Sequence, residues 1–201
     1  MLDAYEIKTN YLQKAKTLYF QNTETITKAI KNKPELSGLL ANIKASILDN
    51  IEYESFREDS DSENLLYAVT AINEGYECVR AIAKLYHTQE KQTEEMIYFK
   101  FIRDTISHPN KLDNPNYQKE PYKKYTKYTF IGVGNIISTT KYFGIETICN
   151  RLFSKEEKEF AVYYNTPNGY VHLICPYSKL WKCVYDLIEQ LIDILKQGEN
   201  Q

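Results

Sequence analysis

The chain has 201 residues and a mass of 23.6 kDa, a size that lets a single domain bury its own core without disulfides or metals. It holds only 7 glycines and 6 prolines against 43% hydrophobic and 26% charged residues, which excludes collagen-like, linker-like and disordered chains and favours helices. The formal charge of −2 excludes an overall basic field, so any contact with nucleic acid must come from a local patch.

Apolar residues recur at helical spacing over the first 51 positions and predict two amphipathic helices. The boundary between them lies near residues 31–35, where Pro34 suits the first turn of the second helix, because its missing N–H falls among donors that are unsatisfied there anyway. The two apolar stripes consist of Tyr5, Tyr11, Leu12, Ala15, Leu18, Tyr19, Leu36, Leu39, Leu40, Ile43, Ile47 and Ile51.

A third helix should begin after the polar residues 58–62, where Ser60 and Glu63 have the spacing of a capping box, and should run to about Tyr86. A fourth should begin near Thr88 and end at His108, because Pro109 disfavours a helical conformation at the residue before it. Four consecutive helices with short connections predict an up-and-down bundle.

The amino-acid composition changes after Pro109. Residues 109–127 hold three prolines and predict a loop, whereas 128–139 are rich in β-branched and aromatic residues. Residues 160–164 and 170–174 flank a turn segment and predict a β-hairpin. Apolar residues at helical spacing then predict a last helix over 176–198.

The predicted fold is therefore mainly α, a four- to five-helix up-and-down bundle with a small β-hairpin-containing insertion before the last helix. We expect a single domain over 1–201, with a four-helix core at 1–108, the loop and β insertion at 109–175, and the C-terminal helix at 176–198.

The cellular location is predicted from what the sequence lacks. The four cysteines form no CxxC pair, and the chain opens with neither a basic nor an apolar leader segment. No apolar run approaches the roughly 18 residues needed to span a bilayer. These features predict a reduced, cytoplasmic protein with no membrane span.

Residues 99–110 hold the most informative pattern in the sequence. On a helix, Phe99, Ile102 and Ile106 form one apolar arc. An adjoining polar arc consists of Lys100, Arg103, Asp104 and Ser107. Because Pro109 ends the helix at His108, the imidazole is free to turn toward the arginine instead of following the helical rotation.

This pattern, Arg103-Asp104-x3-His108-Pro109, resembles the signature of the HEPN superfamily, an arginine usually followed by Asn, Asp or His, with a histidine four to six residues beyond it. The resemblance covers residues 1–108 and the last helix. It implies a bundle of four or five helices and, in many members, a metal-independent endoribonuclease that acts as a toxin or in antiviral or abortive-infection defence. It also implies a homodimer in which two copies of the motif face each other.

The side chains suit RNA cleavage by attack of the 2′-hydroxyl. The unperturbed pKa of histidine, near 6.5, fits proton transfer at neutral pH, so His108 is the candidate general acid or base. The guanidinium of Arg103 matches phosphate oxygens and would stabilise charge on the pentavalent phosphorus. Asp104 would orient one of the two.

Other interpretations of the same residues stay open. A His-Pro helix end with an Arg-Asp pair is also compatible with a C-terminal cap and a surface ion pair. Arg80 and His87 form a second, looser match, without a polar residue after the arginine or a proline after the histidine. The alternatives to a nuclease are a non-catalytic HEPN-like binding or regulatory module, with an antitoxin of the nucleotidyltransferase type as a partner, and an unrelated helical interaction protein.

The loop at 109–127 is a candidate RNA-binding segment. It carries five lysines against two acidic residues, interleaved with tyrosines. Lysines can reach phosphates and tyrosines can stack on unpaired bases, although a solvated loop has the same composition. The candidate RNA contacts are Lys100, Lys111, Lys123, Lys124, Tyr122 and Tyr125.

No metal or cofactor is predicted. His172, Cys175 and Cys183 lack the regular spacing and the fourth ligand of a zinc site, so buried thiols and a strand histidine are the simpler interpretation. Gly132-Val133-Gly134 lacks the third glycine of a dinucleotide-binding turn.

Overall fold

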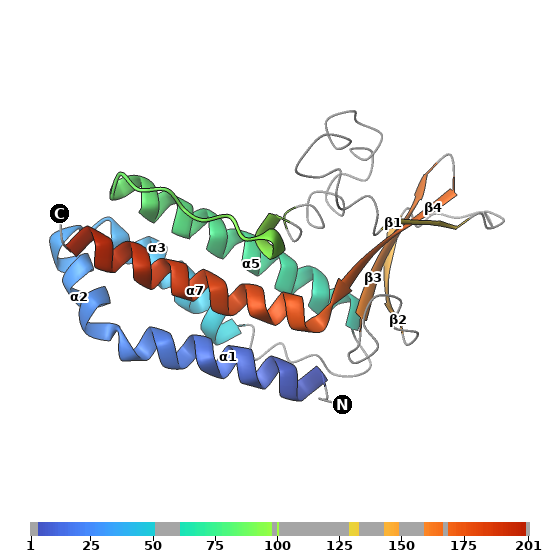
Figure 1. Ribbon diagram of the computed structural model, residues 1–201, viewed down its shortest axis with the longest axis horizontal. Coiled ribbons are helices and arrows are strands. Elements are labelled where there is room, and N and C mark those ends of the chain that lie inside the picture. The colour runs from blue at the N-terminus through green and yellow to red at the C-terminus, as the bar shows by residue number, and fades with distance from the viewer. Residues whose placement is uncertain are drawn as a thin grey trace.

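A computed structural model describes the backbone of residues 4–50, 61–97, 100, 129–132, 143–148, 159–166 and 169–199, and the side chains of 10–49, 69–97, 100 and 181–198. This part of the chain is mainly helical (Figure 1). Its helices are α1 (Ala4–Gln21), α2 (Thr23–Asn32), α3 (Leu36–Ile43), the π-helix η1 (Lys44–Asn50), α5 (Asp61–Leu85) and α7 (Tyr177–Glu199).

The first predicted helix is divided in two at Asn22. The Asn22 side-chain amide donates to the carbonyl of Leu18 at 2.7 Å, and the Thr23 hydroxyl donates to the carbonyl of Phe20 at 2.7 Å. These short polar side chains compete with the backbone for helical acceptors, so α1 ends and α2 begins around them. The expectation of one continuous helix here was wrong.

The second predicted helix begins as α3 and continues as η1. Pro34 lies in the turn before α3, where its carbonyl accepts from the backbone N–H of Ser37 at 3.1 Å. In η1 the Lys44 ammonium lies 2.6 Å from the Asp49 carboxylate. This spacing of five residues matches the i to i+5 repeat of a π-helix.

Helix α5 ends in a Schellman motif at His87. The N–H of Thr88 donates to the carbonyl of Ala83 at 2.9 Å, and the N–H of His87 donates to that of Lys84 at 3.1 Å. His87 takes the left-handed conformation that this motif requires, with φ of 53°.

The expectation of a helix from Thr88 was wrong, because residues 88–93 are not helical. We call this segment the strap. Helical backbone resumes in the turn 94–97, which Thr93 caps: the Thr93 hydroxyl accepts from the N–H of Met96 at 3.3 Å. The N–H of Thr88 is bonded within the Schellman motif that ends α5. The chain then continues through the non-helical residues 88–93 before the next helical turn.

Helix α7 is the centre of the hydrophobic core. It lies between α1 and α5 and also contacts α2 (Figure 1). Trp181 near its start is fully buried. Its other buried residues are Cys183, Val184, Asp186, Leu187, Ile188, Gln190, Leu191, Ile192, Ile194 and Leu195. Burial on almost every side is expected of a helix that other helices surround.

The strands form one antiparallel sheet near the N-terminal end of α7 (Figure 1). Its order is β1-β4-β3-β2, and β4 leads directly into α7. In the β3–β4 ladder, Thr166 at the end of β3 pairs with Gly169 at the start of β4. The strands are β1 (Thr129–Gly132), β2 (Phe143–Ile148), β3 (Glu159–Thr166) and β4 (Gly169–Pro176).

Candidate functional site

The predicted catalytic residues Arg103, Asp104 and His108 lie outside the described residues. The candidate RNA contacts Lys111, Tyr122, Lys123, Lys124 and Tyr125 do so as well. The structure does describe Lys100, a half-buried helical residue three positions before Arg103. It also describes the strap and the helical turn 94–97, which lead into the motif.

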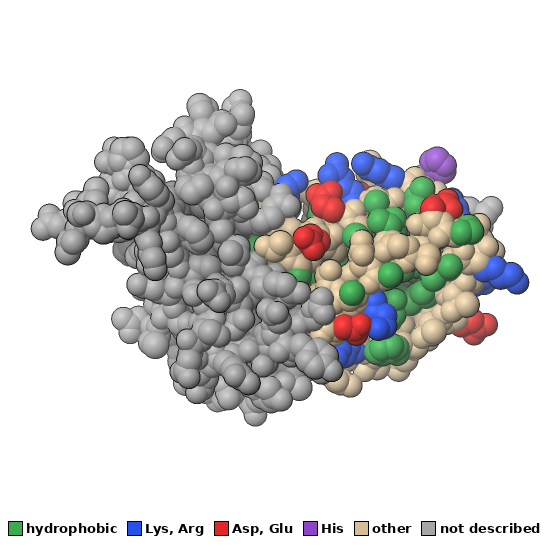
Figure 2. All heavy atoms as spheres, turned by 180° about the vertical axis from the view of Figure 1, so that it is seen from behind, with side chains coloured by type: hydrophobic (Ala, Val, Ile, Leu, Met, Phe, Trp, Pro, Cys, Tyr) green, Lys and Arg blue, Asp and Glu red, His purple; other side chains and the backbone are tan. Residues whose placement is uncertain are grey.

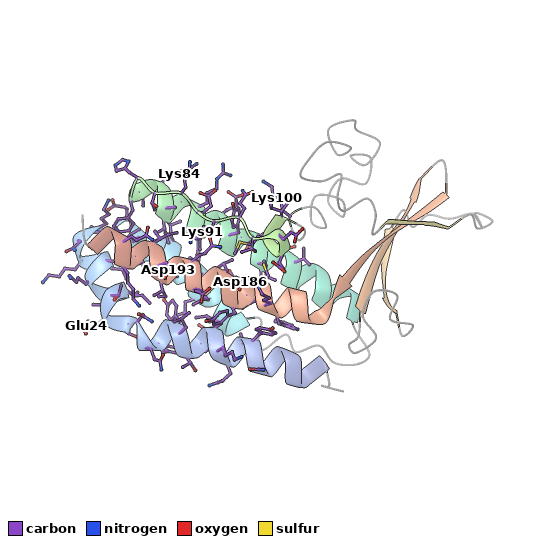
Figure 3. All side chains as sticks on the ribbon, in the orientation of Figure 1. Glu24, Lys84, Lys91, Lys100, Asp186 and Asp193 are labelled. Atoms are coloured by element: carbon purple, nitrogen blue, oxygen red, sulfur yellow. The ribbon has the colours of Figure 1, made fainter. Side chains whose placement is uncertain are left out.

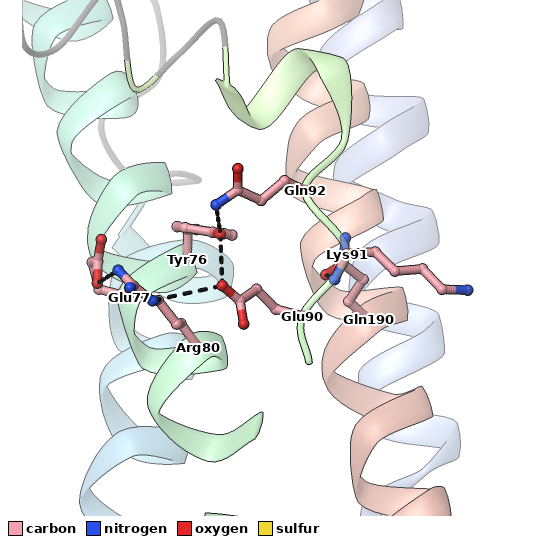
Figure 4. Close-up of polar contacts among 7 residues, drawn as sticks. All are labelled: Tyr76, Glu77, Arg80, Glu90, Lys91, Gln92 and Gln190. Carbon is pink, nitrogen blue, oxygen red and sulfur yellow. Dashed lines mark hydrogen bonds and ion pairs between the residues drawn. The ribbon is translucent and has the colours of Figure 1, made fainter. Parts of the chain in front are cut away.

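The strap is joined to α5 by the hydroxyl of Tyr76. This hydroxyl donates to Glu90 Oε1 at 3.2 Å and accepts from Gln92 Nε2 at 2.6 Å (Figure 4). Tyr76 is only 5% exposed. Burial, together with the nearby carboxylate of Glu90, raises the pKa of Tyr76 to about 12. The phenol is therefore a neutral hydrogen-bonding group at physiological pH.

Arg80 completes this polar cluster. Its Nε lies 3.6 Å from Glu90 Oε1, and its Nη1 lies 3.5 Å from Glu77 Oε2 (Figure 4). The guanidinium thus lies between two carboxylates, which compete with any phosphate for it. No hydrogen bond or ion pair joins Arg80 to His87, both of which the structure describes. In this second Arg-His match, Arg80 therefore belongs to a salt-bridge cluster and His87 to a helix cap.

On its other side the strap is joined to α7 by Gln190. The backbone N–H of Lys91 donates to Gln190 Oε1 at 3.2 Å (Figure 4). The Nε2 of the same side chain donates to the sulfur of Met96 at 3.6 Å. One amide therefore contacts both the strap and the helical turn that follows it.

Charges of both signs share the surface beside the strap. Lys84, Lys91 and Lys100 follow one another along the α5 and strap side (Figure 3). On the opposite face, drawn in Figure 2, lysine and arginine side chains also lie among acidic ones in the described part of the chain. A uniform basic patch, which would indicate an RNA surface by itself, is not formed by the described residues of this region.

A shallow groove lies between α1 and α7. Its lining side chains are amides, hydroxyls and one aliphatic group, together with one charged group. The lining residues are Asn10, Gln13, Lys14, Thr17, Leu18, Gln21 and Tyr185. This set contains no pair of groups able to transfer protons near neutral pH.

Sequence reasoning did not identify the polar roles of Tyr76, Glu90, Gln92 and Gln190. The one available signal was the position of Gln190 within the apolar stripe of the last helix. A polar side chain at such a position needs a buried partner.

Within the described residues, no three His, Cys, Asp or Glu side chains are grouped so as to hold a metal ion. None of the helices in this part of the chain has the length and apolar character needed to cross a bilayer. The chain matches no family model, no curated protein and no solved structure.

Proposed function

We propose that this protein is a HEPN-like, metal-independent endoribonuclease that acts as a toxin or phage-defence effector. The observation that carries the proposal is the sequence motif Arg103-Asp104-x3-His108-Pro109, which the hydrophobic pattern and Pro109 place at the end of a predicted helix. The described chain ahead of the motif includes the capped turn 94–97, where Met96 is 5% exposed within the core. This packed turn supports the proposal, because catalytic groups need a scaffold that packing holds in place.

In this proposal His108 moves the proton of the 2′-hydroxyl or protonates the leaving 5′-oxygen. Arg103 stabilises the charge that develops on the phosphoryl oxygens, and Asp104 orients one of the two side chains. The products are a 2′,3′-cyclic phosphate and a 5′-hydroxyl, so the cleavage step consumes no water. In this proposal His108 and Arg103 supply the proton transfer and charge stabilisation that a metal ion supplies in other nucleases.

The proposal also covers the fold, the oligomeric state, the cellular location and a regulating partner. The scaffold is a four- to five-helix bundle of the HEPN type with the β insertion at 109–175, and two copies form a homodimer that unites two motifs in one site. The protein acts in the cytoplasm, and an antitoxin or regulatory protein controls it. Lys100 and the lysines and tyrosines of the loop after His108 guide single-stranded RNA to this site.

The test is incubation of purified protein with mixed cellular RNA in excess EDTA, followed by analysis of the fragment ends. The wild type should leave 2′,3′-cyclic phosphates. His108→Ala should lower the rate by about 10²–10⁴-fold, the usual contribution of a general acid or base. Arg103→Lys should lower it by about 10²–10³-fold, because the ammonium lacks the planar fork of the guanidinium.

The second Arg-His pair supplies matched controls. His87→Gly and Arg80→Lys should cleave at the wild-type rate, because these residues belong to a helix cap and a salt-bridge cluster. Full activity in His108→Ala would contradict the assignment. Absence of cleavage by every protein, the wild type included, across cellular RNAs would favour a non-catalytic HEPN-like binding module.

A further inference from the structure

The strap is a polar segment between two anchored points. Its six residues are two threonines, two glutamines, a glutamate and a lysine, so it has no large apolar side chain to pack into the core. Within residues 89–92, no backbone group bonds to another backbone group of the part of the chain that the structure describes. The ends are fixed by the Schellman motif at His87 and by Met96, which is buried in the core.

Side-chain hydrogen bonds on two opposite sides hold the strap. On α5, the Tyr76 hydroxyl bonds to both Glu90 and Gln92 (Figure 4). On α7, the Gln190 side-chain oxygen accepts from the backbone N–H of Lys91 (Figure 4). Since Lys91 lies between Glu90 and Gln92 in the chain, the contacts to the two helices act on adjacent residues.

Opening of the strap would break few interactions, and water can replace them. Glu90, Lys91 and Gln92 are half-buried or exposed, so their polar groups reach water as soon as the strap moves. A hydrogen bond exchanged for one to water changes an equilibrium by roughly 2- to 10-fold. Unfolding of the bundle would instead expose the whole apolar core. A segment with few apolar contacts opens locally at a much lower free-energy cost than global unfolding.

We propose that the strap is a latch, a segment that opens as one unit while the helical bundle stays folded. Tyr76 and Gln190 are its two contact points, and each stabilises the closed position of the whole segment. The reason is geometric: loss of the Tyr76 hydroxyl frees both neighbours of Lys91, so the Lys91 N–H between them separates from Gln190 more often. This inference does not depend on the proposed ribonuclease function.

The test measures hydrogen exchange at the backbone amides of Lys91 and Leu191 in the full-length protein, without urea and at low urea. Leu191 is fully buried within α7, so its amide reports unfolding of the bundle. In the wild type, the Lys91 amide should exchange faster than the Leu191 amide. Its rate should also change less with urea, because opening of the latch exposes little surface.

Tyr76→Phe carries the test, because it removes no hydrogen bond of Lys91 itself. It should speed exchange of the Lys91 amide by about 5- to 10-fold through loss of the bonds to Glu90 and Gln92. Gln190→Met removes the acceptor directly and should speed this exchange at least as much. Methionine has nearly the length of glutamine and suits an apolar site, so this variant should fold.

The matched control is Tyr185→Phe on α7. The Tyr185 hydroxyl donates to Glu189 of the same helix at 3.1 Å and has no printed counterpart of the Tyr76 contacts to the strap. Its loss removes the same group from the protein, so exchange of the Lys91 amide should stay at the wild-type rate.

Three results would overturn the latch. A Lys91 amide that exchanges at the rate of Leu191 at every urea concentration would mean that the strap opens only when the bundle unfolds. An unchanged Lys91 rate in Tyr76→Phe would mean that the two sides of the strap do not open as one unit. Equal acceleration in Tyr185→Phe and Tyr76→Phe would mean that the effect does not come from the contacts of the strap.

Discussion

The ring of Tyr86 lies so close to Gly198 that a Cβ at residue 198 would overlap the ring carbons. Tyr86 follows the last residue of α5, and Gly198 is in the last turn of α7. The Lys33 ammonium, which donates to the carbonyl of Leu85, lies 4.6 Å from the centroid of the same ring. The ends of α2, α5 and α7 therefore meet around one aromatic side chain.

This packing predicts opposite effects of two glycine-to-alanine changes. Gly198→Ala should lower the free energy of unfolding by about 1–3 kcal/mol, the usual cost of overpacking. Gly38→Ala in α3 should raise it by about 0.5–1 kcal/mol, because nothing lies within 4 Å of the added Cβ and alanine is the better helix former. Urea unfolding measures both, and equal shifts in the same direction would contradict the contact at Tyr86.

The left-handed conformation of His87 gives a second prediction. A left-handed residue other than glycine costs roughly 1–2 kcal/mol, and the Schellman motif requires this conformation. His87→Gly should therefore raise the free energy of unfolding by about 1 kcal/mol, whereas His87→Val should lower it. Thermal or urea unfolding of the two variants provides the measurement. A stabilising valine would show that the helix end does not constrain this backbone.

Much of the helical core could be predicted from the sequence, because helical periodicity is a local signal. Where side chains are described, most members of the predicted stripes are buried, as Leu12 and Leu40 are, while Leu18 and Leu39 are partly buried. The break at Asn22 could have been predicted too, since Asn and Thr favour helix ends over helix interiors. The start of α5 at Asp61 follows directly after the capping residue expected at Ser60.

The strap could not be predicted in the same way. Its conformation depends on Tyr76, 14 residues from Glu90, and on Gln190, 99 residues from Lys91. Hydrophobic periodicity carries no information about such long-range hydrogen bonds, so it predicts a helix over residues 88–93, where the structure has none. The motif and its chemistry could be predicted from the sequence, whereas the contacts of Gln190 with Lys91 and Met96 are visible only in the folded arrangement.

The loop after His108 gives a prediction about RNA binding. In a His108→Ala background, which keeps the RNA intact, Lys123→Glu with Lys124→Glu should weaken binding of single-stranded RNA. Each lost phosphate contact should reduce the slope of log K against log salt by about 0.7, so two contacts reduce it by about 1.4. Binding titrations at several salt concentrations give this slope.

The control for that experiment changes the same amount of charge elsewhere. Lys31→Glu with Lys84→Glu reverses two exposed lysines on α2 and α5. If binding depends only on the net charge of the protein, the two double variants will have equal affinities. An unchanged slope in the loop variant would reject the loop as an RNA contact.

The buried phenol of Tyr76 predicts how stability changes at alkaline pH. Its pKa is about 12 in the folded protein, compared with 10.0 for an ordinary tyrosine. The unfolded chain therefore loses the phenolic proton first, so the free energy of unfolding should fall as the pH rises from about 10 toward 12. Below that range the proton is bound in both states and this residue adds no pH dependence.

Two variants isolate the contribution of Tyr76. Tyr76→Phe should show a shallower fall than the wild type between pH 10 and 12, since other titrating groups cancel in the comparison. Glu90→Gln removes the nearby negative charge but leaves the burial, so it should lower the pKa of Tyr76 in the folded protein. The fall due to the phenol should still begin near pH 10, where the unfolded chain titrates, but it should end at a lower pH and be smaller than in the wild type. Urea unfolding at several pH values supplies the curves, and identical slopes in the wild type and Tyr76→Phe would mean that the phenol is not held protonated by the fold.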